Sequence, residues 1–255
     1  MSHPRPKRLH KYQPPTSVAF ENLERQQVWL TPPAEFNDPY DCALHVFRDE
    51  LSDAQFAQWR EWLRANDPLD PAAEAFLLAD GEFTAESKQT VLAAMSDAFA
   101  TQRTELLSTV GIACLSESHD NLLMWGHYAH GHRGFCLAFE SGRSPFDHAD
   151  RVDYVTDIPV VDPLSILPGA SPSSYIRTML LTKAACWSYE AEWRVLSREP
   201  NSPASYAGGG LAAIYIGAAA SALVRDRVRA IAQQLQVPVH EMAAARDRFT
   251  LTWTA

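Results

Sequence analysis

Short apolar stretches bounded by proline, glycine or charged residues recur along this chain, and this pattern is typical of β-strands. The expected strands cover residues 9–12, 28–30, 111–115, 134–139, 151–155, 193–197, 212–216, 237–242 and 249–253. Helical spacing predicts helices at 17–26, with Ser17 as the N-cap, and at 218–235. The side chains expected to face inward from these two helices are Val18, Phe20, Leu23, Leu223, Val228, Ile231 and Leu235.

Residues 50–108 have a different character, because they are rich in Ala, Glu, Gln and Leu. Their apolar residues follow helical spacing, and Asp67-Pro68 and Asp80-Gly81 interrupt them. The residues that carry this spacing are Phe56, Trp59, Leu63, Phe76, Leu77, Val91, Met95 and Phe99. We therefore expect two or three helices that form an inserted helical subdomain. It either covers the sheet or forms a lid over a site.

Many short strands with helices at the periphery predict an α+β fold rather than a regular βαβ series. We expect residues 1–255 to form a single domain with a mixed, mostly antiparallel sheet core. The chain has no P-loop, G-x-G-x-x-G, H-E-x-x-H or G-x-S-x-G pattern. Common nucleotidases, dehydrogenases, zinc proteases and serine hydrolases are therefore disfavoured.

Composition, charge and cysteine content restrict the classes of protein to which this chain can belong. Hydrophobic residues make up 46% of the 255 residues, which suffices for a substantial core, and no 18-residue apolar run predicts a membrane span. The net charge of −9 argues against binding nucleic acid through bulk electrostatics. The four cysteines (Cys42, Cys114, Cys136 and Cys186) form no C-x-x-C pair, and no apolar run follows the basic N-terminus. We expect a cytoplasmic protein with free thiols.

A first polar cluster covers residues 32–41, where Asn37 and Asp38 precede Pro39. Asn and Asp before proline favour turns, because their side chains bond nearby backbone amides. Such a turn is either purely structural or holds Asn37, Asp38 and Asp41 at fixed angles toward a ligand.

A second cluster covers residues 121–134 and contains His127, His130 and His132. Since only Asp120 supplies a nearby carboxylate, no metal ion is expected. Trp125 and Tyr128 are three residues apart, so on a helix they share a face. This pair either stacks on a planar ring or packs in the core.

A third cluster, residues 183–196, contains Glu190 and Glu192. On a strand their side chains share one face, and one of two buried neighbouring carboxylates has a raised pKa. Such a pair suits general acid/base work. Alternatively, Lys183 and Arg194 neutralise it in a structural network.

These clusters resemble the bacterial domain-of-unknown-function (DUF) 2971 family, whose name carries no activity. The resemblance rests on Phe36-Asn37-Asp38-Pro39-Tyr40-Asp41, Trp125-Gly126-His127-Tyr128 and Trp187-Ser188-Tyr189-Glu190-Ala191-Glu192-Trp193-Arg194, with residues 9–12, 114–116, 132–136, Lys183 and 214–217. It spans nearly the whole chain outside the central helices.

The layout of a polar first strand, an early helix and a late Glu-x-Glu is similar, more distantly, to ADP-ribosyltransferases. That likeness implies NAD as a substrate, with Glu192 holding the nicotinamide ribose and Glu190 as its partner. It also implies that His10 or Tyr12 contacts the adenosine ribose and that Trp125 or Tyr128 stacks on nicotinamide. The usual Ser-Thr-Ser strand motif is absent, and Leu115-Ser116 stands in its place.

Three functions follow as hypotheses. The first is an ADP-ribosyltransferase-like enzyme using NAD, and Arg133, Lys183 and Arg194 complete its expected ligand-binding set. The second is a hydrolase, acting for example on a phosphodiester, that uses His127 or His132 with Asp38 and Asp41. The third is a binding module without chemistry. A small-molecule nucleotide is the expected partner, and the sequence identifies no macromolecular target.

Overall fold

The computed structural model describes residues 4–45, 52–66, 78–79, 82–160 and 173–254. The strands are β1 (Arg8–Gln13), β2 (Gln27–Leu30), β3 (Leu78–Ala79), β4 (Glu82–Phe83), β5 (Gly111–Ser116), β6 (Phe135–Glu140), β7 (Asp150–Arg151), β8 (Asp153–Val155), β9 (Thr182–Ala184), β10 (Glu192–Ser197), β11 (Ser202–Ser205), β12 (Leu211–Ile216), β13 (Val239–Ala244) and β14 (Leu251–Thr254). The α-helices are α1 (Ser17–Glu24), α2 (Asp53–Asn66), α4 (Ala85–Ser108), α5 (Leu122–Tyr128), α6 (Ser173–Leu180) and α7 (Ala222–Leu235). The described residues also include the 3₁₀ helices η1 (Pro33–Glu35), η2 (Phe146–His148) and η4 (Ala185–Glu190).

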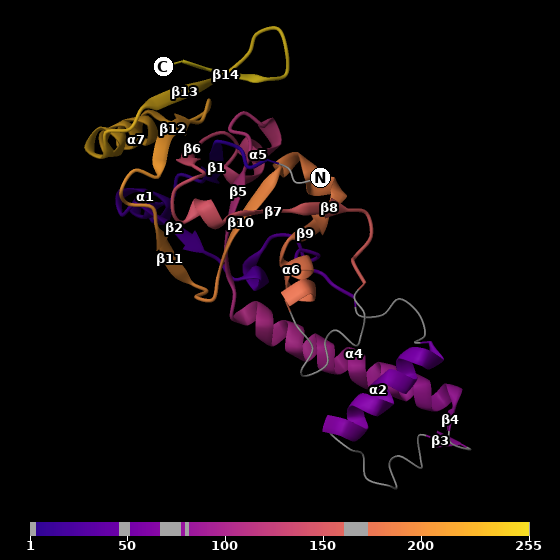
Figure 1. The fold of residues 1–255 in the computed structure, drawn as a ribbon. Coiled ribbons are helices and arrows are strands. Elements are labelled where there is room, and N and C mark those ends of the chain that lie inside the picture. The colour runs from indigo at the N-terminus through magenta and orange to yellow at the C-terminus, as the bar shows by residue number, and fades with distance from the viewer. Residues whose placement is uncertain (1–3, 46–51, 67–77, 80–81, 161–172, 255) are drawn as a thin grey trace.

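An eight-stranded sheet forms the body in the order β14-β13-β12-β6-β1-β5-β10-β7 (Figure 1). The β12–β13 pair is parallel, and the other neighbouring pairs are antiparallel. The α+β fold with a mixed, mostly antiparallel sheet is therefore confirmed. In its centre Ser116 of β5 lies opposite both His10 of β1 and Glu192 of β10. The sheet thus brings the first strand and the third cluster, residues 183–196, together.

The two expected terminal helices form, but their caps lie elsewhere. Thr16, not Ser17, caps α1, because its side-chain oxygen accepts a hydrogen bond from the amide of Ala19. Ser221 caps α7 in the same way, so this helix begins at Ala222 rather than at 218. The expected burial of Val18 and Leu223 is wrong: both lie in the first turn and point outward, 61% and 79% exposed.

The block at 50–108 contains α2 and α4 as expected, together with the short β3–β4 hairpin that the spacing did not predict. Figure 1 shows α2 beside the N-terminal half of α4, beyond the end of the sheet. Phe56 and Trp59 of α2 are buried, as are Val91 and Met95 of α4. The C-terminal half of α4 instead packs on the body, where Phe99 joins a core cluster with α6. The expected positions Phe76 and Leu77 lie outside the described residues.

The strand expected at 151–155 is divided. Its first part, β7, pairs with β10 in the main sheet, whereas β8 pairs in parallel with β9. The separate β8–β9 pair holds Lys183 beside the end of β10, which matters for the site below. In the described part of the chain, no helix is long and apolar enough to cross a membrane.

A series of aromatic ring contacts links His10 of β1 to Tyr215 of β12 and His240 of β13 through His119. The ring centroids of His10 and His119 are 5.2 Å apart, those of His119 and Tyr215 are 4.2 Å apart, and those of Tyr215 and His240 are 5.1 Å apart. Burial, aided by the nearby His119, lowers the pKa of His10 to about 4. His10 is therefore neutral in the folded protein at neutral pH.

We predict that acidification weakens the fold through His10. The unfolded chain gains this proton near pH 6.5 but the folded protein only near pH 4, so stability is lost as the pH falls through that window. The loss is about 3 kcal/mol for a shift of this size. Urea unfolding between pH 7 and 4 should show it in the wild type and not in His10→Gln. His148→Gln, an exposed control, should behave as the wild type. Equal pH dependence in all three would contradict this assignment.

Candidate functional site

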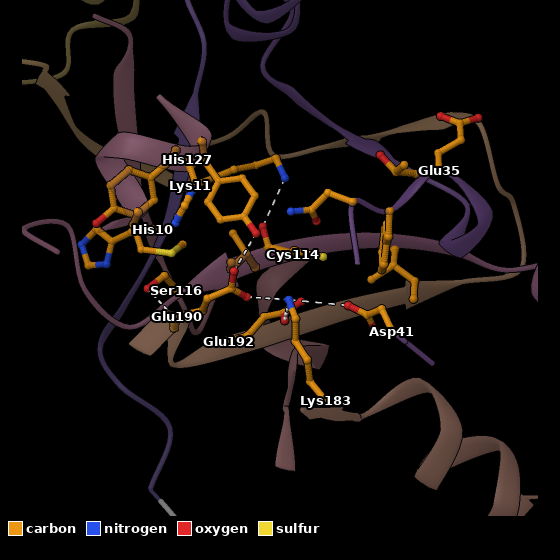
Figure 2. A pocket seen from close by; sticks show the side chains of 18 residues that line it. His10, Lys11, Glu35, Asp41, Cys114, Ser116, His127, Lys183, Glu190 and Glu192 are labelled. Carbon is orange, nitrogen blue, oxygen red and sulfur yellow. Dashed lines mark hydrogen bonds and ion pairs between the residues drawn. The ribbon is translucent and has the colours of Figure 1, made fainter. Parts of the chain in front are cut away.

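A cavity of about 410 Å³ opens between the centre of the sheet, α5 and the segment after β2 (Figure 2). The residues that line it are His10, Lys11, Tyr12, Thr31, Glu35, Phe36, Asn37, Asp41, Ile112, Cys114, Leu115, Ser116, Met124, His127, Tyr128, Lys183, Glu190 and Glu192. The three clusters of the sequence thus all contribute to one cavity. This volume lies within the range of small-molecule sites.

Glu190 and Glu192 reach the cavity by a turn, not along a strand. Glu190 ends η4, Ala191 adopts a left-handed conformation with φ 43°, and β10 begins at Glu192. The expectation of one continuous strand across both residues is therefore wrong. The side-chain hydroxyl of Ser116 donates to the backbone oxygen of Glu190 at 2.6 Å, and the amide of Glu192 donates to the hydroxyl of Tyr154 at 2.8 Å. These bonds fix the turn on both sides.

The turn brings both carboxylates onto one ammonium group. Lys183 Nζ lies 2.6 Å from Glu190 Oε2 and 3.1 Å from Glu192 Oε2, and it is 3.5 Å from Asp41 Oδ2 (Figure 2). All four side chains are at most 5% exposed. The lysine therefore joins the first and third clusters.

Arg194 closes the network from the core side. Its side chain donates to both oxygens of Asp41 at 2.8 Å, to Glu192 Oε1 at 2.8 Å and to the backbone oxygen of Leu180 at 2.7 Å. Arg194 is fully buried and does not line the cavity. The carboxylate cluster, defined as Asp41, Glu190 and Glu192 with Lys183 and Arg194, has three acids and two bases. Its full ionisation leaves one negative charge, so one proton neutralises it.

The pKa values of the two glutamates are shifted in opposite directions. Burial raises the pKa of Glu190 above its ordinary value, against the opposing effects of Lys183 and Tyr128. Burial also disfavours the charged form of Glu192, but Arg194 and Lys183 outweigh it and lower its pKa to about 2. Glu192 therefore stays ionised, and Glu190 is the cluster's proton acceptor. Paired carboxylates whose surroundings separate their pKa values are typical of acid/base sites.

Tyr128 connects α5 to this pair. Its hydroxyl donates to Glu190 Oε1 at 2.6 Å. Burial and the nearby Glu190 raise the pKa of Tyr128, so it remains a neutral donor. His127 also lines the cavity, and its ring centroid lies between 6.2 and 6.3 Å from those of Tyr128, Trp187 and Tyr189.

The first strand supplies the opposite wall. His10 is 5% exposed, and its Nδ1 has no hydrogen-bond partner among the described residues. The Tyr12 hydroxyl donates to the backbone oxygen of Ser118 at 2.9 Å, and Lys11 Nζ donates to that of Cys114 at 3.1 Å. Lys11 and Cys114 were not among the predicted site residues, although Lys11 lies beside His10 in the first strand.

Of the three ligand residues predicted in the segment after β2, two line the cavity. Asn37 and Asp41 line the cavity, but Asp38 does not. Asp38 Oδ1 accepts a hydrogen bond from the amide of Tyr40 at 2.9 Å, which is the turn geometry expected of an Asp before proline. The structure therefore gives Asp38 a structural contact and places Asn37 and Asp41 toward the cavity.

Two residues of the second cluster lie away from the cavity, which corrects the roles expected for them. Trp125 is fully buried, and its indole N–H donates to the backbone oxygen of His119 at 2.8 Å. It packs edge-on against Tyr12 in the core and does not line the cavity. Arg133 contacts the backbone oxygen of His130 at the surface.

The pairing proposed for a hydrolase is not formed in the described residues. No hydrogen bond joins His127 to Asp38 or Asp41, and Arg194 and Lys183 already occupy Asp41. His132 stacks on Trp125, with ring centroids 6.2 Å apart. The described part of the chain also holds no group of three or more His, Cys, Asp and Glu side chains arranged for a metal ion.

No family model matches this chain, and no significant match was found among curated proteins or solved structures.

Proposed function

We propose that this protein is an ADP-ribosyltransferase-like enzyme that cleaves the bond between nicotinamide and ribose in NAD. The observation that carries the proposal is the pair of carboxylates at the cavity wall: Glu192, held ionised, and Glu190, with a raised proton affinity, both on Lys183. Displacement of nicotinamide from the ribosyl carbon needs a fixed negative charge that stabilises the developing positive charge. It also needs a base that accepts the proton of the incoming group.

The chemistry assigns a role to each carboxylate. When the C1′–N bond breaks, its electron pair leaves with nicotinamide, and positive charge develops on the ribosyl carbon and ring oxygen. Glu192 stabilises this charge. An acceptor hydroxyl, amine or water then bonds to C1′ and passes its proton to Glu190. This proton removes the single excess negative charge of the carboxylate cluster.

The remaining walls fit a nucleotide with a flat cationic ring. Tyr128 and Phe36 supply aromatic surface, and aromatic faces attract cations such as the pyridinium of NAD. His10 lines the cavity and is neutral, and a neutral imidazole suits a hydrogen bond with a ribose hydroxyl. Lys11 is placed for an anionic group at the same wall.

The test uses NAD labelled in its adenine half, incubated with the protein and with candidate acceptors. Transfer places the label on an acceptor or on the protein itself, whereas hydrolysis releases labelled ADP-ribose. Either product, formed together with free nicotinamide, supports the proposal. Intact NAD with every acceptor, together with absence of saturable NAD binding, rejects it.

We predict that Tyr128→Phe slows this reaction about 10-fold at neutral pH. The Tyr128 hydroxyl stabilises ionised Glu190, so its removal raises the pKa of Glu190 further and leaves less of the base form. The rate should still rise with pH, but at a higher pH than in the wild type. Tyr206→Phe is the matched control, because the Tyr206 hydroxyl is buried and has no hydrogen-bond partner among the residues that the structure describes. An unchanged pH profile in Tyr128→Phe would show that the Tyr128 hydroxyl does not tune the pKa of Glu190.

A further inference from the structure

The C-terminal half of α4 carries a basic residue on its buried face. Phe99, Arg103 and Leu107 are spaced four residues apart, so they share the side of the helix that packs on the body. Arg103 is half-buried, so the part of its guanidinium that is removed from water needs a polar partner. Among the described residues the carbonyl of Cys42 is such a partner: it accepts from Arg103 Nε at 3.3 Å and from a terminal nitrogen at 3.0 Å.

The contacted backbone is unusual. Cys42 is fully buried and has φ 56°, a left-handed conformation that side-chain-bearing residues rarely adopt. Such strain persists only where surrounding contacts hold it. These contacts include the two bonds from Arg103 and the turn bonds on either side, from Asp41 N to Asp38 O and from Ala43 N to Tyr40 O.

The residue that this conformation positions belongs to the carboxylate cluster. Asp41 directly precedes Cys42, accepts two hydrogen bonds from Arg194 and lies 3.5 Å from Lys183. The Cys42 thiol itself lies 3.5 Å from Asp41 and 3.6 Å from Arg194. A change of the Cys42 backbone therefore moves the third acid of the cluster.

We propose that Arg103 is a positioning residue that links the helical insertion to the candidate site, because it fixes the Asp41–Cys42 turn and thereby the third carboxylate of the cluster. For its effect on catalysis this inference rests on the proposed function. Its effect on the cluster does not depend on the identity of the substrate.

The consequence for the two glutamates has a definite direction. With Asp41 in place, Lys183 and Arg194 are shared among three carboxylates. With Asp41 displaced, two cations serve two glutamates, so Glu190 ionises more readily and its pKa falls. The other titratable groups around the pair include Lys11 on β1, Cys114 on β5, Tyr128 on α5, Tyr154 on β8 and Tyr189 on η4.

The experiment is a carbon-13 NMR titration of the Glu190 carboxyl in the full-length protein without ligand. Arg103→Met should lower the pKa of Glu190 by about one unit. Arg103→Lys keeps a charged group with one donating nitrogen in place of two, so it should show a smaller decrease in the pKa of Glu190. Gln102→Ala, at the neighbouring exposed position of α4, should leave the pKa unchanged.

A double-mutant cycle identifies the route. Asp41→Asn alone should lower the pKa of Glu190, and adding Arg103→Met to it should produce no further decrease. An unchanged pKa in folded Arg103→Met, or an equal decrease in both backgrounds, overturns the proposal. If Arg103→Met does not fold, an unchanged pKa in Arg103→Lys overturns it and a decrease that Asp41→Asn abolishes supports it. The titration is made without NAD. Its result therefore tests the role of Arg103 even if the protein does not cleave NAD.

Discussion

Glu192→Gln is expected to reduce NAD cleavage about 100- to 1,000-fold, which is the usual cost of removing one electrostatic contributor to a transition state. The amide is nearly the same size as the carboxylate but carries no charge, so the developing positive charge on the ribosyl group loses its partner. The loss should appear in kcat more than in KM, because the charge develops only during the reaction. Steady-state release of nicotinamide measures both constants.

The control separates chemistry from stability. Glu192 also holds Arg194 and Lys183, so the folded fraction of Glu192→Gln must be measured by circular dichroism and urea unfolding. Loss of activity in a folded protein supports a catalytic carboxylate. If the variant unfolds, or if it is folded with wild-type turnover, Glu192 is a structural residue and the site is better described as part of a binding module.

Arg194→Met is expected to destabilise the protein by about 3–5 kcal/mol, the cost of leaving buried charges without their partner. Arg194 is fully buried and contacts Asp41, Glu192 and the carbonyl of Leu180. Met fills a similar volume but supplies no donor. Urea unfolding at pH 7 should show the decrease in the free energy of unfolding.

Arg248→Met is the matched comparison for this prediction. Arg248 pairs with Asp247, but their side chains are 71% and 68% exposed. Water screens such a pair, so the expected change is within about 0.5 kcal/mol. A similar small effect for Arg194→Met would mean that the buried network contributes little beyond the volume of its side chains.

The sequence pattern predicted the elements better than their contacts. Alternating and helical spacing located most strands and both terminal helices, because one face of each packs against the core. It failed at helix starts: Thr16 rather than the adjacent Ser17 caps α1, and Ser221 caps α7, which begins at Ala222 rather than at 218. It also missed the division of 151–155 between two sheets, because strand propensity does not identify the pairing partner.

The candidate site was predicted by residue type and corrected by geometry. Glu190 and Glu192 were paired on a strand, whereas the left-handed Ala191 joins them by a turn that leaves both on Lys183. Trp125 was grouped with Tyr128 because they share a helix, yet only Tyr128 reaches the cavity. Spacing within one helix shows which side chains are neighbours, but burial depends on what packs against that helix.

The contributions of Lys11 and Arg103 follow from contacts between distant parts of the chain. Lys11 reaches Cys114 across the sheet, and Arg103 reaches Cys42 from α4, 61 residues away. No local pattern in a single sequence indicates such pairs. The same holds for the sign of each pKa shift, since it depends on burial and on contacts from distant segments, such as Tyr128 at Glu190 and Arg194 at Glu192.

The most direct test of the account is single-turnover release of nicotinamide from NAD by the wild-type protein, measured as a function of pH. The account predicts release whose rate rises with pH through a pKa above the ordinary glutamate value, because Glu190 must lose its proton to act as the base. Glu190→Gln should remove this rise. Absence of nicotinamide release at every pH, from folded protein at saturating NAD, would contradict the central claim.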